Sequence, residues 1–185
     1  MHEIDVTTTY LELASPADFK PALRDDPDLL VMESREVVPA WYRFLYDTVG
    51  QDYAWTGRLS WSDVELRDYL QRPSVTLLVL YVRGTPAGYL ELDSESEESG
   101  TEIVYFGIVP AFHGRGLGKH LLSVGVQRAL DAGAHRVWLH TCSLDGPYAL
   151  ANYQARGFRT YKVTTERQTV PTRRPPGQVT LELGG

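Results

Sequence analysis

The sequence predicts a single α/β domain of the α+β type, in which helices flank a mixed and mostly antiparallel sheet. Two observations lead to this fold class. Three runs rich in β-branched and aromatic residues follow one another through short connections, as antiparallel neighbours do, and they span residues 75–82, 86–93 and 101–109. A glycine-rich turn and an amphipathic run then lead to another apolar run. A strand reached through a crossover helix is most simply parallel to the strand before it.

Composition narrows the class of protein. A chain of 185 residues with 43% hydrophobic residues can bury a substantial core as one domain. Its net charge of −6 argues against non-specific nucleic-acid binding and mildly favours cationic substrates, and we expect no nucleic-acid partner. No apolar run approaches the ~18 residues of a membrane span. Cys142 is the only cysteine and no basic, apolar leader opens the chain, so we expect a cytoplasmic protein without an intrachain disulfide. The oligomeric state stays open, and a homodimer is compatible with the sequence.

Before residue 75 the sequence predicts a strand, a proline-rich loop and two helices. Residues 5–13 are β-branched and aromatic, whereas residues 15–28 contain three prolines, which favour a loop. Residues 29–38 fit either a strand or a helix. Pro39 suits the first turn of a helix, and the predicted apolar face of that helix consists of Trp41, Phe44, Leu45 and Thr48.

The second helix has a clear start. Ser62-Asp-Val-Glu65 has the form of a capping box, and the apolar residues that follow at helical spacing, before Pro73 ends the run, are Leu66, Tyr69 and Leu70. Between the two helices lies an aromatic connector with Tyr53, Trp55 and Trp61. Such a connector either lines a pocket or packs over the core, and both interpretations remain open.

The central strands are better defined. Residues 75–82 and 86–93 form a hairpin around Arg83-Gly84-Thr85, and the acidic loop 93–100 has the composition of a solvated segment. The residues of the third strand that nominally share one face are Glu102, Val104, Phe106 and Ile108.

Gly107 interrupts this third strand just before the glycine-rich turn. An isolated glycine in a strand indicates a bulge or the close approach of another group, although it can also merely relieve local crowding. A bulge here would leave backbone N–H and C=O groups of Ile108 and Val109 free for a ligand.

The stretch from Phe112 to Lys119, Phe-His-Gly-Arg-Gly-Leu-Gly-Lys, joins the third strand to a helix. Its glycines permit positive φ, and the first N–H groups of the helix lack intrahelical acceptors, so the turn is suited to a phosphate or pyrophosphate. The P-loop is excluded because only three residues separate Gly114 from Gly118 and His120 follows the lysine. The dinucleotide fingerprint is excluded because its third glycine is missing.

The rest of the chain completes one domain. The helix 117–130 carries an apolar stripe and is capped by Gly133, and residues 136–142 form a strand. A short helix opens at Asp145-Gly-Pro147 and closes at Gly157, before a strand over 158–166. We place the domain at residues 1–169 and a linker-like tail, rich in proline, at 170–185. Within the tail, residues 179–183 alternate and could add an edge strand.

Three segments, in this order, resemble the GNAT superfamily of N-acetyltransferases. They are Glu102-Ile-Val-Tyr-Phe-Gly-Ile-Val-Pro110, His113-Gly-Arg-Gly-Leu-Gly118 and Tyr153-Gln-Ala-Arg-Gly-Phe158. The likeness covers roughly residues 75 to 165, within which the most specific family motif is Arg or Gln, two residues, then Gly-x-Gly. Gly116 and Gly118 match its glycines, but His113 stands where the family usually has Arg or Gln.

The resemblance implies acetyl-CoA as the acetyl donor. Ile108 and Val109 would pair with its pantetheine arm, and its pyrophosphate would lie against His113, Gly114, Arg115, Gly116, Leu117, Gly118 and Lys119. The acceptor would be an amine of a small molecule or of a peptide, and neither is preferred by spacing or composition. No His or Cys spacing predicts a metal site.

Transfer to an amine requires a base and an acid, since the amine must lose a proton and the departing thiolate must gain one. The resemblance places a general base at Glu102 and the acid at Tyr153. Glu102 could instead be an ordinary solvated residue, and Tyr153 a core aromatic. His140 and Cys142 share a strand face, which permits a covalent acetyl-cysteine alternative.

We therefore expect an acetyl-CoA-dependent N-acetyltransferase that acts by direct attack in a ternary complex. The alternative from another class is a non-catalytic acyl-CoA-binding or regulatory module on the same fold. A third interpretation is a nucleotide-binding protein that uses the glycine-rich turn for ATP.

Overall fold

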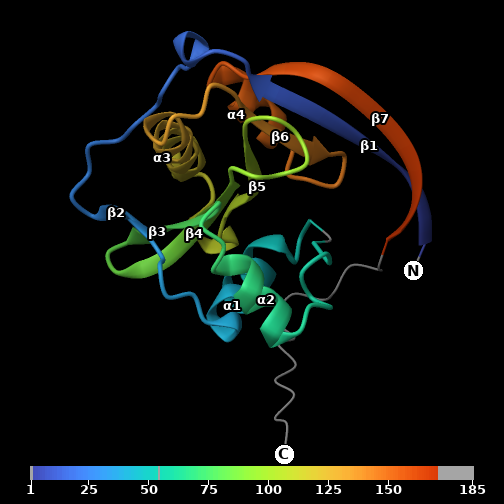
Figure 1. The fold of residues 1–185 in the computed structure, drawn as a ribbon, viewed down its shortest axis with the longest axis horizontal. Coiled ribbons are helices and arrows are strands. Elements are labelled where there is room, and N and C mark those ends of the chain that lie inside the picture. Colours follow the sequence, from blue (N-terminus) through green and yellow to red (C-terminus); the bar gives the residue numbers. More distant parts are fainter. Residues whose placement is uncertain (1, 54, 171–185) are drawn as a thin grey trace, which may run out of the picture.

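The computed structural model describes residues 2–53 and 55–170 (Figure 1). The strands are β1 (His2–Leu13), β2 (Leu29–Glu33), β3 (Val75–Val82), β4 (Thr85–Asp93), β5 (Thr101–Ile108), β6 (Val137–Cys142) and β7 (Arg159–Val170). The helices are α1 (Pro39–Gly50), α2 (Asp63–Leu70), α3 (Leu117–Asp131) and α4 (Ala149–Ala155), with short 3-10 turns at Pro16–Asp18 and Pro110–Phe112. The tail beyond residue 170, including its suggested edge strand, lies outside the described residues.

Within the described residues the strands form one sheet in the order β2-β3-β4-β5-β6-β1-β7. Every neighbouring pair is antiparallel except β5 and β6, which are parallel. The predicted mixed, mostly antiparallel α/β fold is therefore confirmed. Residues 29–33, which fitted a strand or a helix, form the edge strand β2.

Helices cover both faces of the sheet (Figure 1). On one face α3 packs against β4, β5 and β6, and the side chains at the centre of this core include Leu90, Ile103, Leu121, Leu122 and Val126. On the other face α1 and α2 pack against β3, β4 and β5, and this second core includes Tyr42, Leu45, Val49, Val79 and Tyr89. The second core is rich in aromatic side chains.

The helix α1 begins at Pro39 as predicted, but the predicted apolar face is wrong. The structure buries Tyr42, Leu45, Tyr46 and Val49, whereas Phe44 is 56% exposed. The buried stripe is set by contact with the β3 and β4 side chains Val79 and Tyr89, which local spacing does not reveal. The capping box of α2 is confirmed, because the Ser62 hydroxyl accepts from the Glu65 N–H and the Glu65 carboxylate accepts from the Ser62 N–H.

Several element boundaries differ from the predictions by one to four residues. The β3–β4 turn is a two-residue turn with positive φ at Arg83 and Gly84, so Thr85 already belongs to β4. Pro147 precedes α4 rather than opening it. The last strand continues to residue 170 because β1 offers a partner along its whole length.

The predicted face of β5 is also wrong, because the register shifts earlier than Gly107. Glu91 pairs with Tyr105 and Leu92 with Ile103, which leaves Val104 as an extra residue in β5. Ile103 therefore packs in the α3 core with Phe106 and Ile108, while Glu102 lies opposite Asp93 on the other face. Gly107 reflects close approach rather than a bulge, since an added Cβ would overlap Val49 of α1.

Candidate active site

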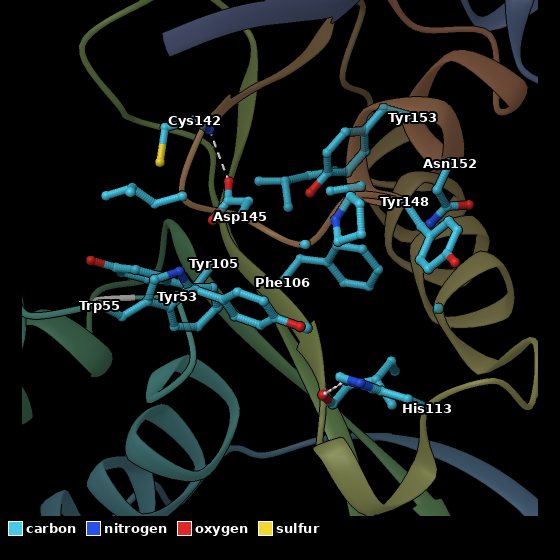
Figure 2. A pocket seen from close by; sticks show the side chains of 18 of the residues that line it. Tyr53, Trp55, Tyr105, Phe106, His113, Cys142, Asp145, Tyr148, Asn152 and Tyr153 are labelled. Carbon is cyan, nitrogen blue, oxygen red and sulfur yellow. Dashed lines mark hydrogen bonds between the residues drawn. The ribbon is translucent and has the colours of Figure 1, made fainter. Parts of the chain in front are cut away.

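A cleft opens where β5 and β6 separate. The two strands pair only at Thr101–Val137 and Glu102–Trp138, and beyond these pairs they diverge. A cavity of about 710 Å³ lies between them, lined by the end of β5, the glycine-rich turn, the start of α3, and α4. Figure 2 shows Tyr53, Trp55 and Tyr105 on one side of this cavity and Tyr148, Asn152 and Tyr153 on the other. We call it the first cavity.

The glycine-rich turn has the geometry of an anion site. Gly114 and Gly116 have φ of 75° and 71°, and Gly116 is the N-cap residue of α3. No side chain caps this helix, so its first N–H groups have neither an intrahelical nor a capping acceptor. The residues that carry them line one end of the cavity. This cradle of backbone donors suits the pyrophosphate of CoA.

A segment of the β1–β2 loop holds the turn from behind. The guanidinium of Arg24 donates to the carbonyl of Arg115 at 2.6 Å and forms an ion pair with Asp26 at 2.9 Å. The Arg24 N–H donates to Nδ1 of His120 at 3.1 Å, and the Ala22 N–H donates to the Ser123 hydroxyl at 2.8 Å. Burial, followed by the charge of Arg24, lowers the pKa of His120 and favours the neutral ring that can accept this bond. Sequence reasoning missed this segment.

The backbone groups expected to be free at the end of β5 are engaged within the protein. The ring Nε2 of His113 donates to the Ile108 carbonyl at 2.8 Å, and the Val109 N–H donates to the Ala87 carbonyl at 2.8 Å. The register shift at Val104 leaves the ladder with β4 intact at this point, so the prediction of groups freed by a bulge is wrong. Pairing of Ile108 and Val109 with the pantetheine arm stays a prediction.

Most of the predicted cofactor residues come together at the first cavity. Its lining includes Ile108, His113, Gly114, Gly116, Leu117, Gly118 and Lys119, together with Tyr153. Val109 and Arg115 are not among the lining residues. Instead, the Arg115 guanidinium lies over the ring of Phe112, 5.2 Å from its centroid.

Tyr153 is 7% exposed and packs against Phe106 and Phe158, with ring centroids 6.1 and 6.3 Å away. Its hydroxyl points into the first cavity (Figure 2). Burial, with a smaller effect from Asp145, raises the pKa of Tyr153. The phenol therefore keeps its proton at neutral pH, which is the form that a general acid requires.

Glu102 does not line the first cavity. It lines a second cavity of about 500 Å³, formed by α2, the acidic loop after β4 and parts of β1, β5, β6 and β7. The Glu102 side chain is only 12% exposed, and burial, with the charges of Asp93 and Glu91 adding to it, raises the pKa of this carboxyl to about 7. A group that titrates near neutral pH is suited to accept a proton.

The two cavities meet beside Glu102. Val104 and His140 line both of them, and Nε2 of His140 lies 3.8 Å from Oε1 of Glu102. Burial lowers the pKa of His140, which favours a neutral ring. Ligands bound in the two cavities would therefore meet at this junction.

The covalent alternative finds no support here. Burial, with the charge of Asp145 adding to it, raises the pKa of Cys142, so the reactive thiolate is disfavoured. The Asp145 carboxylate instead accepts hydrogen bonds from the Thr141 hydroxyl and the Cys142 N–H at 2.6 and 2.9 Å. This carboxylate organises the turn after β6.

The aromatic connector between α1 and α2 both lines a pocket and packs over the core. Tyr53 and Trp55 line the first cavity, and Trp55 also packs on Tyr105 with ring centroids 4.9 Å apart. Trp61 lies away from this cavity, over the guanidinium of Arg58. Of the lining residues that sequence reasoning missed, Tyr148, Asn152 and Asp145 sit near α4 without a local motif that marks them.

A profile of the Acetyltransferase (GNAT) family matches residues 40–158, which is more than half of the chain. The protein therefore belongs to the GNAT acetyltransferase family.

Solved structures share the fold. A GCN5-related N-acetyltransferase from Kribbella flavida is 16% identical, with a TM-score of 0.61 over 92% of this chain and 60% of that one. A putative GNAT acetyltransferase from Novosphingobium aromaticivorans is 16% identical, with a TM-score of 0.58 over 88% and 63% of the two chains. An aminoglycoside acetyltransferase from a soil metagenomic sample is 19% identical, with a TM-score of 0.56 over 71% and 88%. The chain thus spans about three fifths of the first two of these proteins.

Across the residues that the structure describes, no helix has the length and apolar composition needed to cross a membrane. The same part of the chain holds no group of three or more His, Cys, Asp or Glu side chains arranged to bind a metal ion.

Proposed function

We propose that the protein is an acetyl-CoA-dependent N-acetyltransferase that transfers an acetyl group directly to a primary amine. One observation carries the proposal: a cavity with an anion cradle at one end meets a second cavity, and a buried carboxylate that titrates near neutrality lies where they join. A cytoplasmic location, where a soluble donor is available, remains part of the proposal.

Acetyl-CoA fits the first cavity as a co-substrate. The N–H groups at the start of α3 would hold its pyrophosphate, and Lys119 would add positive charge. The end of β5 would lie along the pantetheine arm. Pairing with the Ile108 carbonyl would require the His113 ring to give up its present hydrogen bond.

The chain supplies an acid and a base for the reaction. Glu102 would take a proton from the acceptor ammonium, so that the free amine attacks the thioester carbonyl carbon. The C–N bond forms, the C–S bond breaks, and the departing thiolate takes the proton of the Tyr153 hydroxyl. The second proton of the amine then restores the phenol. The neutral ring of His140 lies beside Glu102 at the entry of the amine.

The similarity to an aminoglycoside acetyltransferase is consistent with an amine acceptor, although at 19% identity it supports the fold alone. The acceptor is a small molecule or a peptide terminus, and the second cavity is where it would enter.

A turnover screen tests the proposal. Acetyl-CoA is incubated with a library of small amines and peptides, and products are identified by mass. We expect at least one N-acetylated product together with stoichiometric free CoA. Saturable CoA binding without turnover on any amine would instead favour a non-catalytic acyl-CoA-binding module. Thermal stabilisation by ATP but not by CoA would favour the nucleotide-binding alternative.

A further inference from the structure

The second cavity has a charge pattern of its own. From it we infer that the acceptor is a small amine with a second cationic group, held with its reacting amine at Glu102 and its other cation at the acidic loop after β4. This inference rests on the proposed function, because it identifies the substrate class of the same site.

Three carboxylates lie on one face of β4 and β5, and two of them already have a cation. Glu91, fully buried, pairs with Arg58 at 3.1 Å and accepts hydrogen bonds from the hydroxyls of Tyr42 and Tyr69, both at 2.7 Å. Asp93, 4% exposed, pairs with Arg72 at 3.3 Å.

Glu102 is the third carboxylate of this face, and within the part of the chain that the structure describes it pairs with no arginine or lysine. Its neighbour in the described structure is His140, whose ring is favoured in the neutral form. A buried carboxylate without a fixed cation is costly when charged. The ammonium group of a ligand would supply the missing positive charge at this point of the cavity wall.

The rim of the cavity carries further negative charge. Five carboxylates and three cationic side chains line the cavity, and two of those cations are the arginines already paired with Glu91 and Asp93. On the acidic loop Glu97 is exposed and has no ion-pair partner among the described residues, while Glu95 is reached by Arg72 only at 3.9 Å. Among the described residues, Glu97 is therefore unpaired and Glu95 only loosely paired, and both line this cavity.

Aromatic rings form the walls of the second cavity between Glu102 and the acidic loop after β4. Tyr10, Tyr69 and Trp138 line the cavity, and aromatic faces accommodate both alkyl chains and cations. Trp138 is 4% exposed, and its Nε1 has no hydrogen-bond partner in the described part of the chain. This N–H donor needs an acceptor, such as a bound water, whereas the aromatic faces and the excess of carboxylates attract cations. The cavity thus suits an organic dication rather than an anion or a purely apolar amine.

The experiment compares 1,5-diaminopentane with n-pentylamine, which differ by one cationic group. Calorimetric titration without acetyl-CoA gives the affinity, and acetyl transfer gives KM for both amines. We expect the diamine to bind about five- to tenfold more tightly, as one extra ion pair at a partly exposed site allows, with a preference that shrinks at high salt.

The double variant Glu95→Gln/Glu97→Gln should abolish the preference. Glu166→Gln, an exposed carboxylate on β7 that does not line the cavity, is the matched control and should keep it. Equal affinity for the two amines in the wild type would overturn the inference, as would a preference that survives in the double variant.

The binding and turnover readouts separate the two proposals. Acetylation of both amines without preference leaves the acetyltransferase proposal intact and removes the dication inference. Preferential binding of the diamine with no acetyl transfer to any amine supports the cation site but overturns the proposed activity.

Discussion

The two ends of the cleft handle charge in different ways. At the proposed cofactor end, backbone N–H groups in a glycine-rich turn form the anion cradle, and hydrogen bonds from the β1–β2 loop, one of them from the Arg24 guanidinium, hold it. At the proposed acceptor end, which is the second cavity, buried carboxylates and guanidinium groups lie among aromatic rings. The backbone N–H groups of one local turn can bind a pyrophosphate, whereas the second cavity is built from side chains of several elements. The acceptor end is therefore more exposed to disruption by single substitutions.

The largest expected effect concerns stability at the acceptor end. Arg58 is 8% exposed, and its guanidinium lies 4.0 Å from the ring centroids of both Trp61 and Tyr69. Arg58→Met leaves Glu91 buried without a cation and should lower the free energy of unfolding by about 3–5 kcal/mol, measured by urea denaturation. Adding Glu91→Gln should restore part of the loss. An unchanged midpoint in Arg58→Met would contradict the described role of the ion pair.

The next effect concerns catalysis at the junction of the cavities. Glu102→Gln should lower kcat about a hundredfold or more, because the proposed general base is lost. In the wild type, kcat/KM should rise with pH through the Glu102 pKa of about 7, since only the carboxylate accepts a proton, and this limb should vanish in the variant. Glu36→Gln, exposed and lining neither cavity, is the control. A pH limb that persists in Glu102→Gln would assign the base elsewhere.

Glu102→Gln should also change the pH dependence of thermal stability. The pKa of Glu102 is higher in the folded than in the unfolded state. The protonated side chain therefore contributes to stability at a pH below its unfolded-state pKa, and this contribution is lost as pH rises through about 7. Glu102→Gln should therefore raise Tm above that pH relative to the wild type, with little change in acid. An equal change in Tm at both pH values would argue against the raised pKa.

A smaller effect is expected for the proposed acid. Tyr153→Phe keeps the packing against Phe106 and Phe158 but removes the hydroxyl, and kcat should fall about tenfold to a hundredfold at nearly constant Tm. Tyr81→Phe, on β3 away from both cavities, should match the wild type. Full activity in Tyr153→Phe would remove Tyr153 from the mechanism.

The smallest effect tests the cofactor end. Arg24→Ala removes the hydrogen bond to the Arg115 carbonyl, so KM for acetyl-CoA should rise about fivefold while kcat stays unchanged. Arg35→Ala, whose side chain is 80% exposed, is the control and should leave both constants unaltered. A fall in kcat as large as the fall in kcat/KM would show that Arg24 does more than position the turn.

Local signals in the sequence determined a large part of this protein. The capping box at Ser62 and the positive-φ glycines of the turn were predicted because each depends on residues within a few positions of one another, and the crossover from β5 to β6 was predicted because a helix connects the two strands. Most of the predicted cofactor residues, all but Val109 and Arg115, gather at one cavity because they belong to one continuous segment.

The tertiary structure decided what depends on distant pairing. The extra residue at Val104 arises from the register of β5 with β4. Because of it, Glu102 lines the second cavity while Ile108 packs in the α3 core. Arg24 contacts Arg115 across 91 residues, and Arg58 meets Glu91 across 33. No local pattern encodes such pairs, because burial and register are set jointly by all the strands and helices that pack together.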